Sequence, residues 1–298
     1  MRRLMILCRK NGQLGNRLMV YAHVMAAARE RGWTLYNPTF AEYSDDFEGP
    51  RGHLASCSQV LPEGRPIAAW KRTLACFLLR VGYQLGKPLR FLLGGRLAYL
   101  RARNAAHIDL GEALPAIEAR ATQVLLLQGY HFRNAEWARA HAPWLRTFFR
   151  PLAQYRDQAE PLVAGLRAQV DVVVGMHIRH GDYARHLQGR FFYSVEQYLG
   201  LMRRMVRVLA PQRVGFVVCS NALHGAADFA EFRMVRGPGG VISDLHALSL
   251  CDYVLGPPSS YSSWAAFAGN TRLLRVEKPT VEFSLADFTR QEAPETEY

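Results

Sequence analysis

Short apolar runs that alternate with glycine- or polar-rich turns and helical patterns constrain the fold of this chain more than any other feature. In the first half, Leu4–Cys8 is such a run, and a helical pattern follows at Leu18–Arg31. Val124–Leu127 is a second clear apolar run. This alternation is typical of an open, mostly parallel sheet covered by helices. The sequence therefore predicts an α/β protein.

The second half repeats the alternation, and its elements follow one another more regularly. The predicted strands are Val172–Met176, Val214–Val218, Tyr253–Leu255 and Leu273–Val276, and the predicted helices between them are Val195–Leu209, Asp244–Cys251 and Ser262–Ala268. Because parallel sheets bind ligands beyond the carboxyl ends of their strands, the residues just after each predicted strand are the first candidates for a site.

The length of 298 residues is enough for two compact domains. Proline and charged residues interrupt the apolar pattern around Pro151–Pro161, which indicates a boundary there. We therefore expect an N-terminal domain at 1–156 and a C-terminal domain at 157–298. Two sheets that face each other across a cleft would follow from this division.

The strongest candidate site follows the predicted strand Val172–Met176, where two histidines, an arginine and an aspartate come close together. Arg179 suits a diphosphate, because its planar fork donates parallel hydrogen bonds and stays charged. Asp182 could position Arg179 or accept a proton. Two other interpretations remain open: a structural ion pair between Arg179 and Asp182, and a zinc site. The zinc ligands would be His177, His180, Asp182 and His186, although Arg179 would repel a metal.

A second candidate is the serine-rich segment Ser259–Ser263, which follows the predicted strand Tyr253–Leu255 and opens a helix. The first turn of a helix presents unpaired N–H groups and the positive end of the helix dipole, and serine hydroxyls could add further donors to a phosphate. The alternative is that these serines only cap the helix.

Other polar residues stand near the predicted strand ends. Asp244 could accept two ring N–H groups of guanine, or it could simply favour the dipole of its helix. Ser220 and Asn221 follow the strand Val214–Val218, whereas Ser194 with Gln197 is a capping box without chemistry.

Near the N-terminus, Gly12, Gly15 and Asn16 form a tight turn that could let a sugar or phosphate approach the backbone. The turn matches neither a dinucleotide fingerprint nor a Walker loop. We therefore expect neither a nicotinamide cofactor nor ATP to bind there.

Taken together, these segments resemble the α-1,2-fucosyltransferase family (glycosyltransferase family 11) and, more distantly, the α-1,6- and protein O-fucosyltransferases. Three groups of residues carry the resemblance: Gly12 to Leu18 with Tyr21-Ala22, His177 to Tyr183, and Asp244-Leu245 through Ser249–Cys251 to Ser259–Ser262 with Trp264–Ala266. The middle group is similar to the family's H-x-R-R-x-D motif.

The resemblance implies a GT-B fold of two Rossmann-like domains, GDP-fucose as donor, no metal, and inversion at the fucose anomeric carbon. Arg179 would bind the donor β-phosphate and Asp244 the guanine, while His177 would lie beside the nucleotide. The phosphate-side serines would be Ser259, Ser260 and Ser262, joined on the donor side by Ser220 and Asn221. Gly12, Gly15, Asn16 and Tyr183 would belong to the acceptor side or a nearby loop.

Two positions depart from the family pattern. His180 stands where the motif usually has a second arginine, and Arg17 stands where a glutamine is common after Gly15-Asn16. The first departure concerns diphosphate binding, and the second concerns the acceptor side. The rival to an active transferase is a catalytically silent nucleotide- or carbohydrate-binding protein of the same fold.

The formal net charge of +12 indicates anionic partners, which include nucleotide sugars. No acidic residue lies between Glu63 and Asp109, and the segment 66–103 mixes arginines with large apolar residues. This pattern is typical of basic amphipathic helices on an anionic membrane or of a solvated basic face, and lipid-linked glycan acceptors would suit the first. We expect no nucleic acid partner, because only the charge favours one.

The five cysteines are widely spaced, odd in number and without a C-x-x-C pair, which favours a reducing compartment. The expected location is therefore the cytoplasm, with peripheral contact at the inner face of a membrane.

Overall fold

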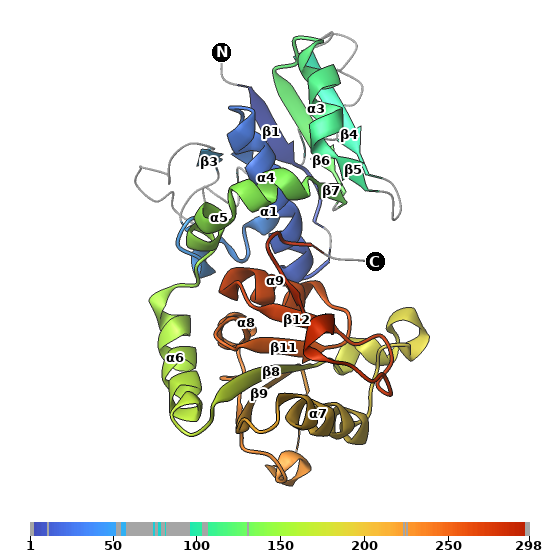
Figure 1. The fold of residues 1–298 in the computed structure, drawn as a ribbon. Coiled ribbons are helices and arrows are strands. Elements are labelled where there is room, and N and C mark those ends of the chain that lie inside the picture. Colours follow the sequence, from blue (N-terminus) through green and yellow to red (C-terminus); the bar gives the residue numbers. More distant parts are fainter. Residues whose placement is uncertain are drawn as a thin grey trace. The chain divides into compact units, whose positions relative to one another are not determined.

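The chain folds into two compact units, each built around its own sheet (Figure 1). The computed structural model describes residues 3–10, 12–51, 55–57, 74, 77–78, 81, 96–102, 107–129, 131–222, 224 and 226–295. Unit 1 comprises Met1–Arg150 together with Ala293–Tyr298, and unit 2 comprises Pro151–Glu292. The chain therefore leaves unit 1, builds the whole of unit 2 and then returns to unit 1.

The predicted boundary between residues 156 and 157 needs correction, because it falls inside helix α6 (Ala153–Arg167). The prolines around this point indicated a break, yet Pro161 lies within the helix. Ala159, Val163 and Leu166 lie on the buried side of α6, at the spacing of successive helical turns. Burial of this apolar face offsets the hydrogen bond that Pro161 cannot donate.

Unit 1 contains a five-stranded sheet in which strands distant in sequence lie side by side. Across the sheet the order is β3 (Ala55–Cys57), β2 (Thr34–Tyr36), β1 (Leu4–Leu7), β6 (Val124–Gln128) and β4 (Leu97–Arg101). β1 is parallel to both neighbours, with Met5 opposite Leu35 and Leu125, and β3 is the antiparallel edge. A second, two-stranded parallel sheet pairs β5 (Ile108–Asp109) with β7 (Phe132–Arg133).

The helices of unit 1 that the structure describes are α1 (Leu14–Glu30), α3 (Leu110–Glu118), α4 (Ala135–Ala140) and α5 (Ala142–Phe148). α1 is buried along almost its whole length from Leu14 to Ala28. A helix that is apolar on all sides belongs in a core, and the many alanines let neighbouring elements approach α1 closely.

His23 ties α1 to the segment that returns from unit 2. Its ring is fully buried, and its Nδ1 accepts a hydrogen bond from the Asn134 N–H at 3.2 Å, while its Nε2–H donates to the Pro294 carbonyl at 2.7 Å. Burial, reinforced by the nearby charge of Arg133, lowers the pKa of His23 to about 3. The ring is therefore neutral at physiological pH and acts as a structural link.

We expect His23→Ala to destabilise the protein by about 3 kcal/mol, because it leaves a buried N–H and a buried carbonyl without partners and opens a cavity. His141→Ala is the control, since the His141 ring pairs with the Glu30 carboxylate near the surface and not with buried backbone groups. Its cost should be below about 1 kcal/mol. Urea unfolding of both variants checks the difference, and equal costs would contradict it.

Unit 2 contains a six-stranded sheet whose order is β10 (Met234–Arg236), β9 (Val214–Ser220), β8 (Val172–Ile178), β11 (Tyr253–Gly256), β12 (Arg272–Arg275) and β13 (Thr289–Arg290). All neighbours are parallel except β13, which runs antiparallel to β12. The carboxyl ends of β8, β9 and β11 therefore meet at one edge, with Ile178 opposite Ser220 and Met176 opposite Leu255.

Helices cover both faces of the sheet of unit 2. Val172, Val174, Met176 and Ile178 share a core with the buried face of α7 (Val195–Leu209). On the other face Gly175 approaches α8 (Val241–Ser249), and Gly215 approaches α6. α9 (Ser260–Gly269) packs against α8. The capping box predicted for Ser194 and Gln197 is present at the start of α7.

The predicted α/β class with parallel sheets is confirmed in both units. None of the helices in the described part of the chain is long and apolar enough to cross a membrane.

Candidate nucleotide-sugar site

Arg179 lies one residue beyond β8, at the edge of the sheet of unit 2 where the parallel strands end. Its backbone N–H donates to the hydroxyl of Tyr198 on α7 at 3.1 Å, which fixes the backbone of this loop. Its guanidinium stacks on the ring of Tyr183 at 5.0 Å, and the Tyr183 hydroxyl donates to the Pro258 carbonyl at 2.8 Å. One aromatic ring thus connects Arg179 to the segment that opens α9.

The serine-rich segment begins α9 at the same edge, directly after β11. Ser259 is the N-cap, and its hydroxyl accepts from the Tyr261 N–H at 3.2 Å. The hydroxyls of Ser262 and Ser263 both donate back to the Ser259 carbonyl, at 3.1 and 3.0 Å, and Ser262 is fully buried. In the free protein these hydroxyls serve the helix itself. Ser260, which is half-buried, and the first-turn N–H groups are the remaining donors for an anion.

His177 occupies the penultimate position of β8, on the face toward α9. A side chain at Gly256 would meet the His177 carbonyl at 2.5 Å, so only glycine allows β11 to approach this closely. The imidazole packs against the Tyr261 ring with 5.1 Å between centroids, and its Nδ1 is buried without a hydrogen-bond partner among the described residues. Burial, followed by the charge of Arg179, lowers the pKa of His177 to about 3. The neutral ring is a poor proton donor at physiological pH.

Asp244 lies in the first turn of α8 and is 7% exposed. The Gly239 N–H donates to its Oδ1 at 2.7 Å, and a side chain at Gly237 would strike both this oxygen and the Cys219 sulfur at 2.6 Å. Burial raises the pKa of Asp244 to about 6, although the bond from Gly239 opposes the shift. A carboxylate that is costly to keep charged in the free protein gains most from a ligand that donates hydrogen bonds to it.

Tyr261 joins the two helices that border the site. Its hydroxyl donates to the Val241 carbonyl at the start of α8 at 2.7 Å, while its ring packs on His177. Neither Tyr261 nor Tyr198 was predicted from the sequence as a site residue. Tyr261 lies within the serine-rich segment that was predicted to bind an anion, and this position was the one sequence feature that could have indicated its role. Tyr198 has the pattern of any buried residue on a helix.

Ser220 and Asn221, at the end of β9, contact the residues around them. The Asn221 amide pairs with the backbone of His180 in both directions, with N–O distances of 2.8 and 3.3 Å. The Ser220 hydroxyl lies 2.9 Å from His224 Nε2. Asn221 therefore shapes the loop after β8, and its direct contact with a donor stays a prediction.

His180 stands where the resemblance of the sequence leads us to expect a second arginine, and its ring is held by two neighbours. Its Nε2 lies 2.6 Å from the Tyr193 carbonyl and must carry a proton to donate to it, while its ring stacks on Phe192 at 4.6 Å.

Two side chains named in the sequence analysis, Asp182 and His186, lie outside the part of the structure that is described, although the backbone of both falls in short 3-10 helices. Among the described residues, no group of three or more histidine, cysteine, aspartate or glutamate side chains could hold a metal ion.

The residues predicted for the acceptor side divide between the units. Gly12 makes the turn before α1 with φ +63°, Gly15 is buried in α1, and Asn16 is half-buried in its first turn. Tyr183 instead belongs to unit 2 and is 7% exposed, since its ring packs in the core of that unit and also contacts Arg179. The assignment of Tyr183 to the acceptor side or a nearby loop stays a prediction.

The sequence matches no family model and no curated protein. Solved structures do resemble it. A mutant of Arabidopsis thaliana FUT1 in complex with GDP is 15% identical, with a TM-score of 0.60 over 97% of this chain and 74% of that one. POFUT1 in complex with GDP-fucose is 13% identical, with a TM-score of 0.53 over 90% of this chain and 95% of that one. The chain has the fold of these fucosyltransferases.

POFUT1 in complex with GDP is a further structure of this fucosyltransferase fold, at 13% identity and a TM-score of 0.51 over 91% of this chain and 95% of that one. The likeness to these structures confirms the predicted fold class, an α/β fold of GT-B type with parallel sheets. The roles of individual residues rest on the contacts described above.

Proposed function

We propose that this chain is a glycosyltransferase that uses GDP-fucose and transfers fucose to a hydroxyl of a glycan. One observation supports this most: Arg179 and the first turn of α9 lie at the same sheet edge, linked through Tyr183. The fold likeness to fucosyltransferases that contain GDP and GDP-fucose agrees with this donor.

In this reaction negative charge grows on the β-phosphate as the bond to the sugar breaks. Arg179 and the positive end of α9 would stabilise that charge, so that no metal is required. The attack would come from the face opposite the leaving diphosphate and would invert the anomeric carbon. Asp182 remains our candidate to accept the proton of the attacking hydroxyl, because His177 has a pKa lowered to about 3, which makes it a weak base, and is buried against Tyr261.

The resemblance of the sequence motifs favours an α-1,2-type linkage and a glycan or lipid-linked glycan as acceptor. Thermal shift with nucleotides tests the donor first: GDP and GDP-fucose should raise the melting temperature more than UDP or ADP and their sugars do. Equal shifts for all nucleotides would contradict the proposal.

A catalytically silent binding protein is the alternative function. It would show the same GDP-selective stabilisation, but neither transfer of fucose nor slow hydrolysis of GDP-fucose. Release of GDP from GDP-fucose, followed with and without a glycan mixture, separates the two.

The raised pKa of Asp244 predicts how guanine binding depends on pH. The ionised carboxylate is the form that accepts the ring N–H groups of guanine, and its pKa in the free protein is about 6. Affinity for guanosine should therefore be constant well above pH 6 and fall about tenfold per pH unit below it. Guanosine is used because it has no phosphate to titrate, and flat affinity down to pH 5 would contradict the role of Asp244.

We also propose peripheral contact with an anionic membrane through 66–103, from the cytoplasmic side. Most of that segment lies outside the described residues, but Leu74, Phe77, Leu78 and Val81 are described in helical conformation and are exposed. Their spacing places them along one side of a helix. Co-sedimentation with anionic but not with neutral vesicles supports the contact. A protein that co-sediments with neither kind of vesicle contradicts it.

A further inference from the structure

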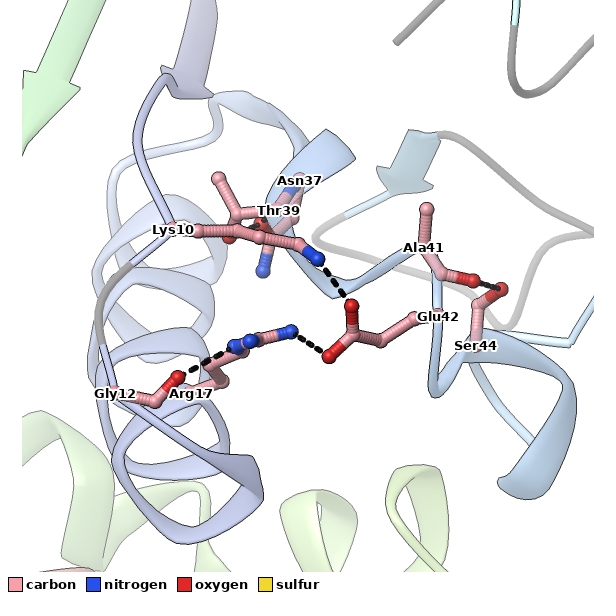
Figure 2. A network of polar contacts seen from close by, with 8 residues as sticks. All are labelled: Lys10, Gly12, Arg17, Asn37, Thr39, Ala41, Glu42 and Ser44. Carbon is pink, nitrogen blue, oxygen red and sulfur yellow. Dashed lines mark hydrogen bonds and ion pairs between the residues drawn. The ribbon is translucent and has the colours of Figure 1, made fainter.

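A cluster of charged side chains in unit 1 lies outside the site described above. It stands where the neighbouring parallel strands β1 and β2 end, because Lys10 follows β1 and Asn37 follows β2. Lys10 and Arg17 bind the two carboxylate oxygens of Glu42, one each (Figure 2). Arg17 also donates to the Gly12 carbonyl at 3.1 Å, and its guanidinium lies 5.2 Å from the Tyr43 ring centre.

The start of α1 adds positive potential to this cluster. The side chain of Gln13, the N-cap residue, makes no capping hydrogen bond to α1, and the first turn contains no acidic residue. A side chain at Gly12 would overlap Asn16 at 2.2 Å, and φ is +63° there, so this tight approach to the helix requires glycine. The N–H groups of an uncapped first turn favour an anion nearby.

Asn37 supplies an independent observation. It is 6% exposed, and its Oδ1 already accepts from the N–H and the hydroxyl of Thr39, at 3.2 and 2.6 Å. Its Nδ2 is buried without a hydrogen-bond partner among the described residues. Figure 2 shows this amide on the same side of α1 as Lys10 and Arg17. A buried amide donor without an acceptor is uncommon and indicates a place for a ligand oxygen or a water.

The balance of donors and acceptors indicates the charge of that ligand. Lys10, Arg17, the Asn37 Nδ2 and the N–H groups of the first turn of α1 are all donors, and the Glu42 carboxylate accepts from Lys10 and Arg17. The Glu42 side chain is 40% exposed, whereas the Arg17 side chain is 9% exposed. Glu42 can therefore turn into solvent, while Arg17 stays and needs another anion.

Glu42 is also unsuited to act as a base. Burial raises its pKa, but its hydrogen bonds to Lys10 and Arg17 outweigh that effect and leave the pKa below its usual value. It stays ionised and weakly basic, so in the free protein it neutralises the charge of Lys10 and Arg17 and does not take up a proton.

We infer that Lys10, Arg17, Asn37 and the start of α1 form a site for an anionic group of the acceptor, and that the Glu42 carboxylate occupies this site in the free protein. The acceptor would carry a carboxylate or a phosphate. The identification of the ligand as the acceptor rests on the proposed transferase function. The anion site itself does not, because it lies within unit 1.

Isothermal titration of the full chain with glucuronate, glucose 6-phosphate and glucose tests the site. Glucuronate binding assigns a carboxylate and glucose 6-phosphate binding a phosphate, while glucose is the neutral control. Lys10→Ala should weaken anion binding about tenfold. Glu42→Gln should strengthen it about tenfold, because the competing internal carboxylate is gone. Arg120→Ala is the matched control. Arg120 is exposed and precedes the amino end of β6, whereas the proposed site lies beyond the carboxyl ends of β1 and β2 in the same sheet.

The inference is overturned if neither anion binds more tightly than glucose, or if Arg120→Ala weakens binding as much as Lys10→Ala does. Weaker anion binding by Glu42→Gln would also overturn it. GDP-induced stabilisation of the same samples reports on unit 2 separately. Failure of the anion site with intact GDP binding is thus distinguishable from failure of the proposed donor.

Discussion

Arg179→Ala should lower the rate of fucose transfer by about two to three orders of magnitude, the usual cost of removing one preorganised donor from a developing negative charge. Arg179 lies beyond the carboxyl end of β8, and its guanidinium contacts the ring of Tyr183. The Tyr183 hydroxyl in turn bonds the Pro258 carbonyl just before α9. The transition state carries more charge on the β-phosphate than the ground state does. GDP binding should therefore weaken less than turnover. Steady-state release of GDP from GDP-fucose, together with GDP titration, measures both.

Two further variants sharpen this result. Arg179→Lys keeps the charge but loses the planar fork, and it should recover only part of the rate. Arg207→Ala, on α7, removes an arginine whose side chain is 65% exposed and should change the rate by less than about twofold. Full activity of Arg179→Lys would contradict bidentate binding, and full activity of Arg179→Ala would contradict the site as a whole.

Asp244→Asn should weaken GDP binding about 10- to 100-fold and remove the preference for guanine nucleotides, because hydrogen bonds to a charged acceptor are among the stronger ones. The same change should not lower the melting temperature of the free protein at pH 7. Burial raises the pKa of Asp244 to about 6, so the native fold holds this charge at a cost that the neutral amide avoids. The amide oxygen can still accept from the Gly239 N–H.

Asp157→Asn is the control for Asp244→Asn, since Asp157 is exposed on α6 and no ligand role is proposed for it. It should leave both GDP affinity and melting temperature unchanged. If Asp244→Asn lowers the melting temperature of the free protein as well as its affinity for GDP, the carboxylate has a structural role and is not a guanine ligand.

The sheet of unit 2 was the part of the fold most open to prediction from sequence. Val172–Met176 is an unbroken apolar run, as expected for a strand covered on both faces, and β8 begins at the predicted residue. The strand continues to Ile178, which carries His177 into the sheet and buries its ring. A pattern of residues cannot reveal this, because burial depends on Gly256 and Tyr261 from distant parts of the chain.

The surroundings of Asp244 were hidden for a related reason. β10 was not predicted, since Met234–Arg236 is short and precedes a glycine-rich turn. Without β10 the helix was expected to start at Asp244, whereas α8 starts at Val241 and turns Asp244 toward Cys219 and Gly237. Likewise, Ser259 and Ser262 were predicted from their place at the start of a helix, which does not tell a hydroxyl that caps the helix from one offered to a ligand.

The return of the chain to unit 1 has a consequence for how the protein is made. Ala293 to Glu295 are synthesised after the whole of unit 2, yet they supply the carbonyl that satisfies His23 in the interior of unit 1. On the ribosome, the half that starts first is completed last. A released chain that ends before residue 293 would contain all of unit 2, while the central histidine of its N-terminal half would still lack its acceptor.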